Sequence, residues 1–213
     1  KVTAYVMWTA PAAVLAAVAA TITTEGLGIL GTYGKFIGGY YVALLVLWAV
    51  LLGLGAMVIG PRVRALVSMI RGPLLLAFST ASSEAAYPKT LEQLERFGVS
   101  PRIASFVLPL GYSFNLDGSM MYCTFATLFI AQAYGIDLSG TQLITLLLLL
   151  LVTSKGIAGV PRASLVVLAA TLPHFGIPDA GLLLVLAVDQ FLDIGRSATN
   201  VVGNSIASSV VAK

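Results

Sequence analysis

Residues 181–212 read GLLLVLAVDQFLDIGRSATNVVGNSIASSVVA, an apolar stretch interrupted by five strongly polar side chains. These side chains are spaced four, three, four and four residues apart, which places them on one face of a single helix. Each charge inside hydrocarbon costs about 3 kcal/mol. We therefore expect this face to meet partners or a cavity inside a membrane protein. The residues are Asp189, Asp193, Arg196, Asn200 and Asn204.

The composition of the whole chain also indicates a membrane protein. The 213 residues are 58% hydrophobic and 10% charged, with a mean hydropathy of +0.97, whereas a soluble domain has roughly 25% charged residues. Half of the lysines and arginines lie between residues 62 and 102. This clustering indicates membrane topology and excludes nucleic-acid binding. We expect the single cysteine, Cys123, to be a packing residue.

Two uncharged stretches near the start of the chain predict spanning helices. Residues 4–22 and 36–61 are each about long enough to cross roughly 30 Å of hydrocarbon. Arginines at positions 62, 64 and 71 follow the second span, so that residue 62 is expected in the cytoplasm. The chain begins at Lys1 and enters a span directly, from which we expect preceding helices to be missing.

Later segments are too short or too interrupted for simple spans. Residues 72–97 predict a re-entrant helical hairpin with a Ser-rich tip, and residues 141–173 predict a second one with a Gly/Pro-rich tip. Residues 103–136 form a broken helix, because two glycines, Asn115 and Asp117 interrupt an apolar run. A hairpin followed by a spanning segment thus occurs twice. The predicted fold is an all-α membrane protein with an inverted repeat, an arrangement typical of secondary transporters.

The last helix, at residues 181–212, carries the chemistry. Asp193 and Arg196 can neutralise each other in part, and the five donors of the guanidinium leave some for a second anion, such as a substrate carboxylate. Asp193 could accept an ammonium group, and Asn200 could donate to another carboxylate. The alternative is a buried ion pair that only holds helices together.

Oxygen-bearing side chains at the interruption indicate a cation site. Asn115, Asp117 and Asn204 offer the ligands that hard cations prefer, although they could instead satisfy broken backbone. Lys155 and Arg162 flank the second tip, and their alternative role is to extend to the membrane interface.

An enzyme is a poor interpretation of these residues. Asp117 and Asp193 would have to share a proton to act as a protease dyad, and Arg196 would keep Asp193 ionised. His174 is the one histidine and belongs to no HExxH pattern, and no GxSxG motif is present. We expect no catalytic residue and no cofactor.

Four motifs in order resemble the dicarboxylate/amino acid:cation symporters, the glutamate transporter family, in its bacterial proton/glutamate symporter-like members. They are STASSE at residues 79–84, FNLDGS at 114–119, SKGIAGVP at 154–161 and DQFLDIGRSATNVVGN at 189–204. The resemblance implies a multi-pass homotrimer in the lipid of the cell (inner) membrane. Residues 1–22 would belong to a fixed scaffold, and residues 23–213 to a transport domain that moves like an elevator.

The resemblance also implies roles for individual residues. Arg196 would bind the side-chain carboxylate of the substrate, Asp193 its ammonium group and Asn200 its main-chain carboxylate. The second hairpin would be the outer gate. The remaining residues of the implied substrate site are Ser82, Ser83, Ser119, Val160 and Ser197. One implied cation site is a possible sodium site at Gly111, Asn115, Asn200 and Asn204. The other implied cation-binding residues are Ser113, Asp117, Ser154 and Ile157.

Three positions bear on the cation and the substrate. Asn204 stands where many sodium-coupled relatives have Asp, and Lys155 adds a positive charge beside an implied sodium site, so that H⁺ is expected as the coupling ion in preference to Na⁺. The branch that carries C4-dicarboxylates such as succinate, fumarate and malate tends to lack an Asp at the position of Asp193, because its substrates have no ammonium group. Its presence therefore favours glutamate or aspartate, with C4-dicarboxylates as the alternative small acidic substrate.

Overall fold

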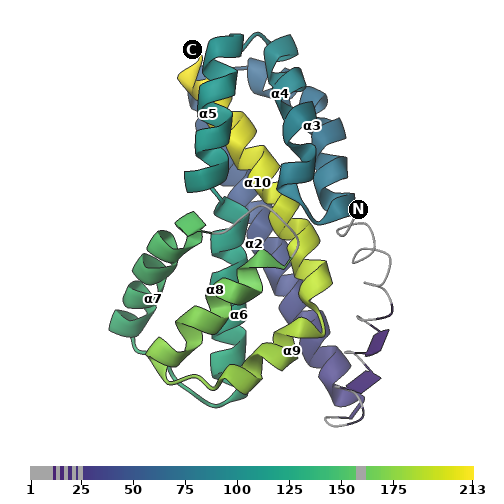
Figure 1. Cartoon of the computed structure of the whole chain (residues 1–213), viewed down its shortest axis with the longest axis vertical. Coiled ribbons are helices and arrows are strands. Elements are labelled where there is room, and N and C mark those ends of the chain that lie inside the picture. The colour runs from purple at the N-terminus through teal and green to yellow at the C-terminus, as the bar shows by residue number, and fades with distance from the viewer. Residues whose placement is uncertain (1–11, 13–14, 17–18, 21–22, 24–25, 157–161) are drawn as a thin grey trace.

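The computed structural model describes residues 26–156 and 162–213, with a few isolated positions between residues 12 and 23. Every regular element in this part of the chain is a helix, as predicted. Figure 1 shows α2 (Gly28–Ile59) and α10 (Asp189–Val211) running side by side through the molecule. The remaining helices gather at its two ends. The predicted scaffold helix at residues 1–22 lies almost wholly outside the described residues.

The helix α2 is long and apolar. It contains 32 residues and begins at Gly28, earlier than the span predicted at 36–61. Gly60 ends it with a φ of 64°, a conformation that favours glycine. Leucine and valine side chains along α2 are exposed, which suits a surface in contact with lipid. Among the described helices, only α2 and α3 (Arg62–Thr80) could cross a membrane by length and composition.

The first predicted hairpin is formed by α3 and α4 (Ser83–Phe97), which pack together and are joined by Ala81 and Ser82. The Ser82 side chain caps α4 by accepting a hydrogen bond from the backbone N–H of Ala85 at 3.2 Å. The hairpin begins at Arg62 and not at residue 72. Arg62 is exposed at the start of α3, and its guanidinium donates to the Phe97 carbonyl at the end of α4, at 3.1 Å.

The predicted broken helix consists of α5 (Pro101–Phe114) and α6 (Asp117–Ala133). Asn115 and Leu116 separate the two, with Asn115 at φ −127° and ψ 62°. Asp117 lies in the first turn of α6, where a negative charge interacts favourably with the helix dipole. The interruption therefore lies where the polar residues predicted it.

The second predicted hairpin contains α7 (Gly140–Thr153), the short 3₁₀ helix η1 (Ser154–Gly156) and α8 (Ala163–Thr171). Residues 157–161 of its tip lie outside the described part of the chain. A capping box between Ser139 and Gln142 begins α7. α8 lies against α6, whereas α7 diverges from α8 (Figure 1). A further 3₁₀ turn, η2 (Leu172–Phe175), follows α8.

The last segment differs from the single helix predicted at residues 181–212. After η3 (Asp179–Gly181) and α9 (Leu182–Leu186), the helix is interrupted at Ala187 and Val188. Val188 has φ −118° and ψ 2°, outside the helical range. All five polar residues of the predicted face lie in α10, and the first of them, Asp189, is in its first turn.

The helix α10 lies at the centre of the fold, where α2, α3, α4, α5 and α6 pack around it. One apolar cluster at the end formed by α6, α8 and α9 includes Tyr40 and Leu168. A second cluster at the opposite end includes Leu94 and Ile206. This arrangement buries nearly the whole polar face of α10 inside protein.

Candidate functional site

The ion pair predicted on the last helix is present. Arg196 Nε lies 2.6 Å from Asp193 Oδ1, and neither side chain is more than 1% exposed. Both charges are thus taken out of solvent within one turn of α10. A buried pair of this kind is costly to break, because the remaining charge would be unpaired.

Hydroxyl and amide groups surround the Arg196 guanidinium. Its two terminal nitrogens lie 3.4 Å from Ser119 Oγ and 3.5 Å from Ser197 Oγ. The Asn200 side chain donates to Ser119 Oγ at 3.3 Å and accepts from the backbone N–H of Gly118 at 2.9 Å. Together with Asp193, the structure therefore brings together five of the predicted substrate-site residues from α6 and α10.

Gly118 makes this assembly possible. A Cβ at position 118 would overlap the backbone carbonyl of Arg196. The first turn of α6 consequently approaches α10 closely enough for the Gly118 N–H to reach Asn200. In the sequence, Gly118 indicates only a break in a helix, and the neighbouring Asn and Asp residues give no sign of its contact with α10.

A second group of charges extends the site towards the start of α10. Asp189 is fully buried, and its Oδ1 accepts a hydrogen bond from the Tyr122 hydroxyl at 2.5 Å. Its Oδ2 lies 3.3 Å from Arg162 Nε. The backbone N–H of Arg162 donates to Asp193 Oδ2 at 2.9 Å. Arg162 therefore contacts both carboxylates, which the alternative role of extending to the membrane interface does not account for.

No binding role for these additional residues is predicted from the sequence. Asp189 belonged to the polar face, but its partner Tyr122 comes from an apolar part of α6 that shows no pattern. Arg162 lies next to the tip of the second hairpin, and its contact with α10 joins elements that are distant in the chain. The one available signal was the balance of charges. α10 has two acidic residues, Asp189 and Asp193, but one cation, Arg196, so that a second cation from elsewhere in the chain could be expected.

At the broken helix, the predicted oxygen ligands face α10. Asn115 Nδ2 donates to Asn204 Oδ1 at 3.3 Å. A Cβ at Gly111 would overlap Asn204 Oδ1, and a Cβ at Gly203 would overlap Asp117 Oδ2. Among the described residues Asp117 Oδ2 has no hydrogen-bond donor. Carboxylate and amide oxygens therefore converge between the break and α10.

The second hairpin contacts the same break through a lysine. Lys155 Nζ donates to the carbonyl of Phe114, the last residue of α5. The hydroxyls of Ser113 and Ser154 instead bond to carbonyls within their own turns, at Pro109 and Leu151. Neither hydroxyl is brought to the converging oxygens by a contact within the described residues.

The remaining predicted residues lie at the hairpin tips. Ser82 caps α4, and Ser83 is buried with its Oγ lacking a hydrogen-bond partner in the described part of the chain. Ile157 and Val160 fall outside the described residues. Within the described ranges, no group of three His, Cys, Asp or Glu side chains is placed to hold a metal ion.

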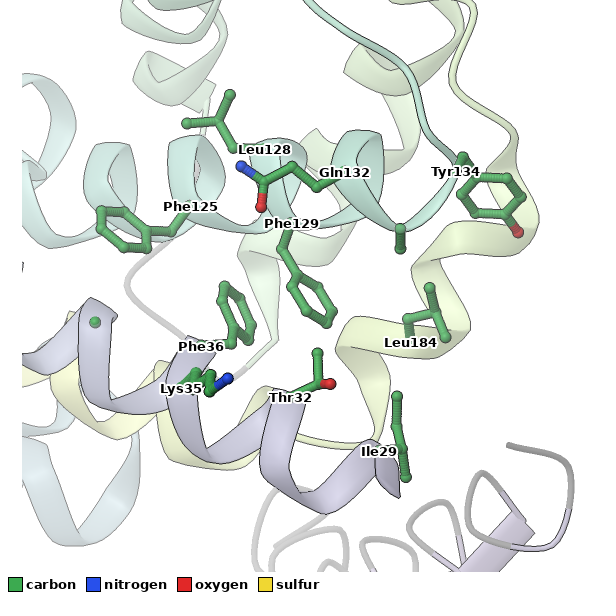
Figure 2. A pocket seen from close by; sticks show the side chains of 12 residues that line it. Ile29, Thr32, Lys35, Phe36, Phe125, Leu128, Phe129, Gln132, Tyr134 and Leu184 are labelled. Carbon is green, nitrogen blue, oxygen red and sulfur yellow. The ribbon is translucent and has the colours of Figure 1, made fainter. Parts of the chain in front are cut away.

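A cavity of about 850 Å³ lies away from the charged residues of α10, between α2 and α6. Figure 2 shows the rings of Phe36 and Phe129 facing each other in it, and their centroids are 4.1 Å apart. None of the predicted site residues lines this cavity. The candidate site is therefore the buried polar face of α10 and not the cavity between α2 and α6.

Comparison with known families and curated proteins gives a consistent result. A family model described as "Sodium:dicarboxylate symporter family" matches residues 1–213. The chain is 49% identical over 213 residues to the proton/glutamate-aspartate symporter of Escherichia coli K12, covering 100% of the chain and 49% of that protein.

Two further relatives differ in their named substrates. The proton/sodium-glutamate symport protein of Bacillus subtilis 168 is 45% identical over 98% of the chain and 48% of its own length. The C4-dicarboxylate transport protein 2 of Polaromonas naphthalenivorans CJ2 is 44% identical over 98% of the chain and 47% of its own length. The chain spans about half the length of these relatives.

Proposed function

This chain belongs to the sodium:dicarboxylate symporter family, and from that membership and the buried face of α10 we propose that it forms the substrate-binding half of a transporter for glutamate or aspartate. The family and its named relatives are transporters, and the chain is accordingly a membrane protein. The transporter would work as a secondary active symporter, in which a cation moving down its gradient drives substrate uptake.

The observation that carries this proposal is the buried Arg196. Its Nε is held by Asp193, while its terminal nitrogens lie near the hydroxyls of Ser119 and Ser197 at long hydrogen-bond distances. Hydroxyl groups can rotate from acceptor to donor, so that a substrate carboxylate could be bound by the guanidinium and these hydroxyls together. Asn200 would complete the site from the next turn of α10.

Asp193 supports an amino acid as the substrate. Both of its oxygens accept one contact, from Arg196 Nε and from the Arg162 N–H. Each carboxylate oxygen has a second lone pair, which an ammonium group could use. A C4-dicarboxylate lacks this ammonium group and is the second candidate, supported by the relative from Polaromonas naphthalenivorans that is named for that substrate.

For the coupling ion, the proposal is H⁺ in preference to Na⁺. Asn115 already donates to Asn204 Oδ1, and the ammonium of Lys155 contacts the Phe114 carbonyl at the end of α5. The first contact occupies an oxygen of the implied sodium site, and the second places a positive charge beside the break in the helix. Asp117 Oδ2, which has no donor among the described residues, is suited to carry a proton.

We also propose the architecture that the family resemblance implies. The charged, amphipathic α4 is unsuited to cross hydrocarbon, which supports a chain that returns through α4 as a re-entrant hairpin. The second hairpin would be the gate. Residues 23–213 would move as an elevator within a homotrimer in the inner membrane, against a scaffold that includes residues 1–22.

The test is uptake of radiolabelled aspartate by the full-length protein in proteoliposomes, with a proton or a sodium gradient imposed and with succinate as competitor. Proton-driven uptake that resists succinate is expected. Arg196→Ala should abolish uptake of any dicarboxylate, and Asp193→Ser should lose aspartate while sparing succinate. Normal aspartate uptake by both variants would refute the assigned site, whereas strong succinate competition in the unmodified protein would favour the second candidate.

A further inference from the structure

Arg162 is the residue through which the second hairpin contacts both carboxylates at the start of α10. We propose that Arg162 is a latch that holds α8 closed over the binding site, through its side chain to Asp189 and its backbone N–H to Asp193. The gating role of this latch rests on the proposed function, whereas the contacts themselves do not.

The backbone of Arg162 indicates that its position is enforced by these contacts. Its φ is 64°, in the left-handed region that L residues adopt at a cost in energy. A strained residue of this kind persists when its surroundings hold it. Here the N–H lies 2.9 Å from Asp193 Oδ2 and Nε lies 3.3 Å from Asp189 Oδ2.

The charges explain why α8 would be held closed. Asp193 has Arg196 as its cation, so that Arg162 is the cation nearest to the second buried carboxylate, Asp189. Tyr122 supplies a hydrogen bond to Asp189 but no charge. Moving α8 away from α10 would leave Asp189 buried without its cation, which is strongly unfavourable.

The latch would connect the gate to the substrate. Opening α8 breaks the bond between Arg162 N–H and Asp193, the carboxylate proposed to bind the substrate ammonium group. Closure would re-form that bond beside the bound ammonium. The strength of the pair between Arg162 and Asp189 would therefore set how often the hairpin opens.

The chain contains a built-in reporter of this movement. Cys123, its single cysteine, is 1% exposed on α6, and its Sγ lies 3.9 Å from the carbonyl of Ser164 in α8. Lifting α8 from α6 would uncover this thiol. Its rate of reaction with a maleimide therefore measures opening without any need for transport.

The experiment compares maleimide labelling of Cys123 in the full-length protein with that in Arg162→Asn, Arg162→Lys, Asp189→Asn and the Arg162→Asn/Asp189→Asn double variant. Asn accepts a positive φ and carries no charge. From typical coupling energies of contacting residues, each single neutral variant should label roughly tenfold faster. The Lys variant should stay nearer the unmodified rate, and Cys123→Ala gives the blank from any other cysteine.

Two results would overturn the latch. One is an unmodified labelling rate in both Arg162→Asn and Asp189→Asn. The other is a double variant whose acceleration equals the product of the two single effects, since members of one ion pair should not act independently. If Arg162→Asn fails to fold, Asp189→Asn and Arg162→Lys still give the comparison. Faster labelling in a protein that transports no acidic substrate would support the latch and refute the proposed function.

Discussion

The two hairpins that flank α10 are held in different ways. In the first, α3 and α4 pack against each other, and Ala77 and Ala86 form a buried cluster with Val201 of α10. In the second, α7 diverges from α8 (Figure 1), and buried leucines such as Leu168 pack in the apolar cluster shared with α6. Its contacts with α5 and α10 among the described residues include the polar contacts made by Lys155 and Arg162.

This difference indicates which of the two hairpins can open. Small apolar side chains packed between helices give contacts that are lost only when the helices separate as a whole. Contacts made by a few long side chains can break and re-form while the core stays intact. We therefore expect the first hairpin to unfold with the protein and the second to open by itself.

A matched pair of core truncations should separate the hairpins most strongly. Leu94 of α4 and Leu168 of α8 are both fully buried, and Leu→Ala at such sites costs about 2–5 kcal/mol. Leu94→Ala should lower the thermal unfolding midpoint of the full-length protein in detergent. Leu168→Ala should lower it less and instead accelerate labelling of Cys123. Val166→Ala, at an exposed position of α8, is the control, and equal falls in the midpoint would contradict the comparison.

The lysine of the second hairpin should have the next largest effect. Lys155→Met removes the ammonium that donates to the Phe114 carbonyl, and a hydrogen bond from a charged group contributes about 1.5–3 kcal/mol. We expect faster Cys123 labelling with an unchanged unfolding midpoint. Lys35→Met, at an exposed lysine of α2, should change neither quantity. A lower unfolding midpoint with an unchanged labelling rate in Lys155→Met would show that Lys155 stabilises the whole fold and does not hold the second hairpin closed.

Helix caps provide a smaller and closely matched test. Ser82 caps α4 and Ser139 caps α7, each by accepting a backbone N–H, and loss of a Ser cap costs about 1 kcal/mol. Ser82→Ala should lower the unfolding midpoint, and Ser139→Ala should leave it unchanged. The comparison fails if Ser139→Ala lowers the midpoint as much as Ser82→Ala does.

The smallest expected effect is a stabilisation of the first hairpin. Ala81 has a φ of 50°, and Gly at such a position avoids a cost of about 1 kcal/mol. Ala81→Gly should therefore raise the unfolding midpoint slightly. Ala86→Gly, within α4, should lower it. A decrease in both variants would show that the methyl group of Ala81 contributes more by packing than it costs by strain.

The sequence predicted those features whose signal is local. The five polar residues of α10 share a face because helical spacing alone determines it, and the ion pair between Asp193 and Arg196 follows from their separation by three residues. The interruption at Asn115 and Leu116 was visible because polar groups and glycines are costly in an apolar helix. Substrate, coupling ion and elevator movement stay predictions that the transport experiments test.

Features that depend on distant parts of the chain were not predictable in the same way. The pairing of Arg162 with Asp189 exists only because α8 is brought to the start of α10. The interruption at Ala187 and Val188 lies in an apolar run that contains no helix breaker. The start of α3 at Arg62 was not predicted, and the contact of its guanidinium with the Phe97 carbonyl joins residues that are 35 positions apart in the chain.

The close approaches at Gly118 and Gly203 have a genetic consequence. Every single-nucleotide missense change of a glycine codon introduces a side chain with a Cβ. At position 118 that atom would overlap the Arg196 carbonyl, and at position 203 it would overlap the Asp117 carboxylate. In a saturation mutagenesis screen scored by growth on an acidic amino acid, codon 118 should tolerate synonymous changes alone, because the overlapping atom belongs to the backbone, whereas codon 203 should tolerate small residues to the extent that the Asp117 side chain can move.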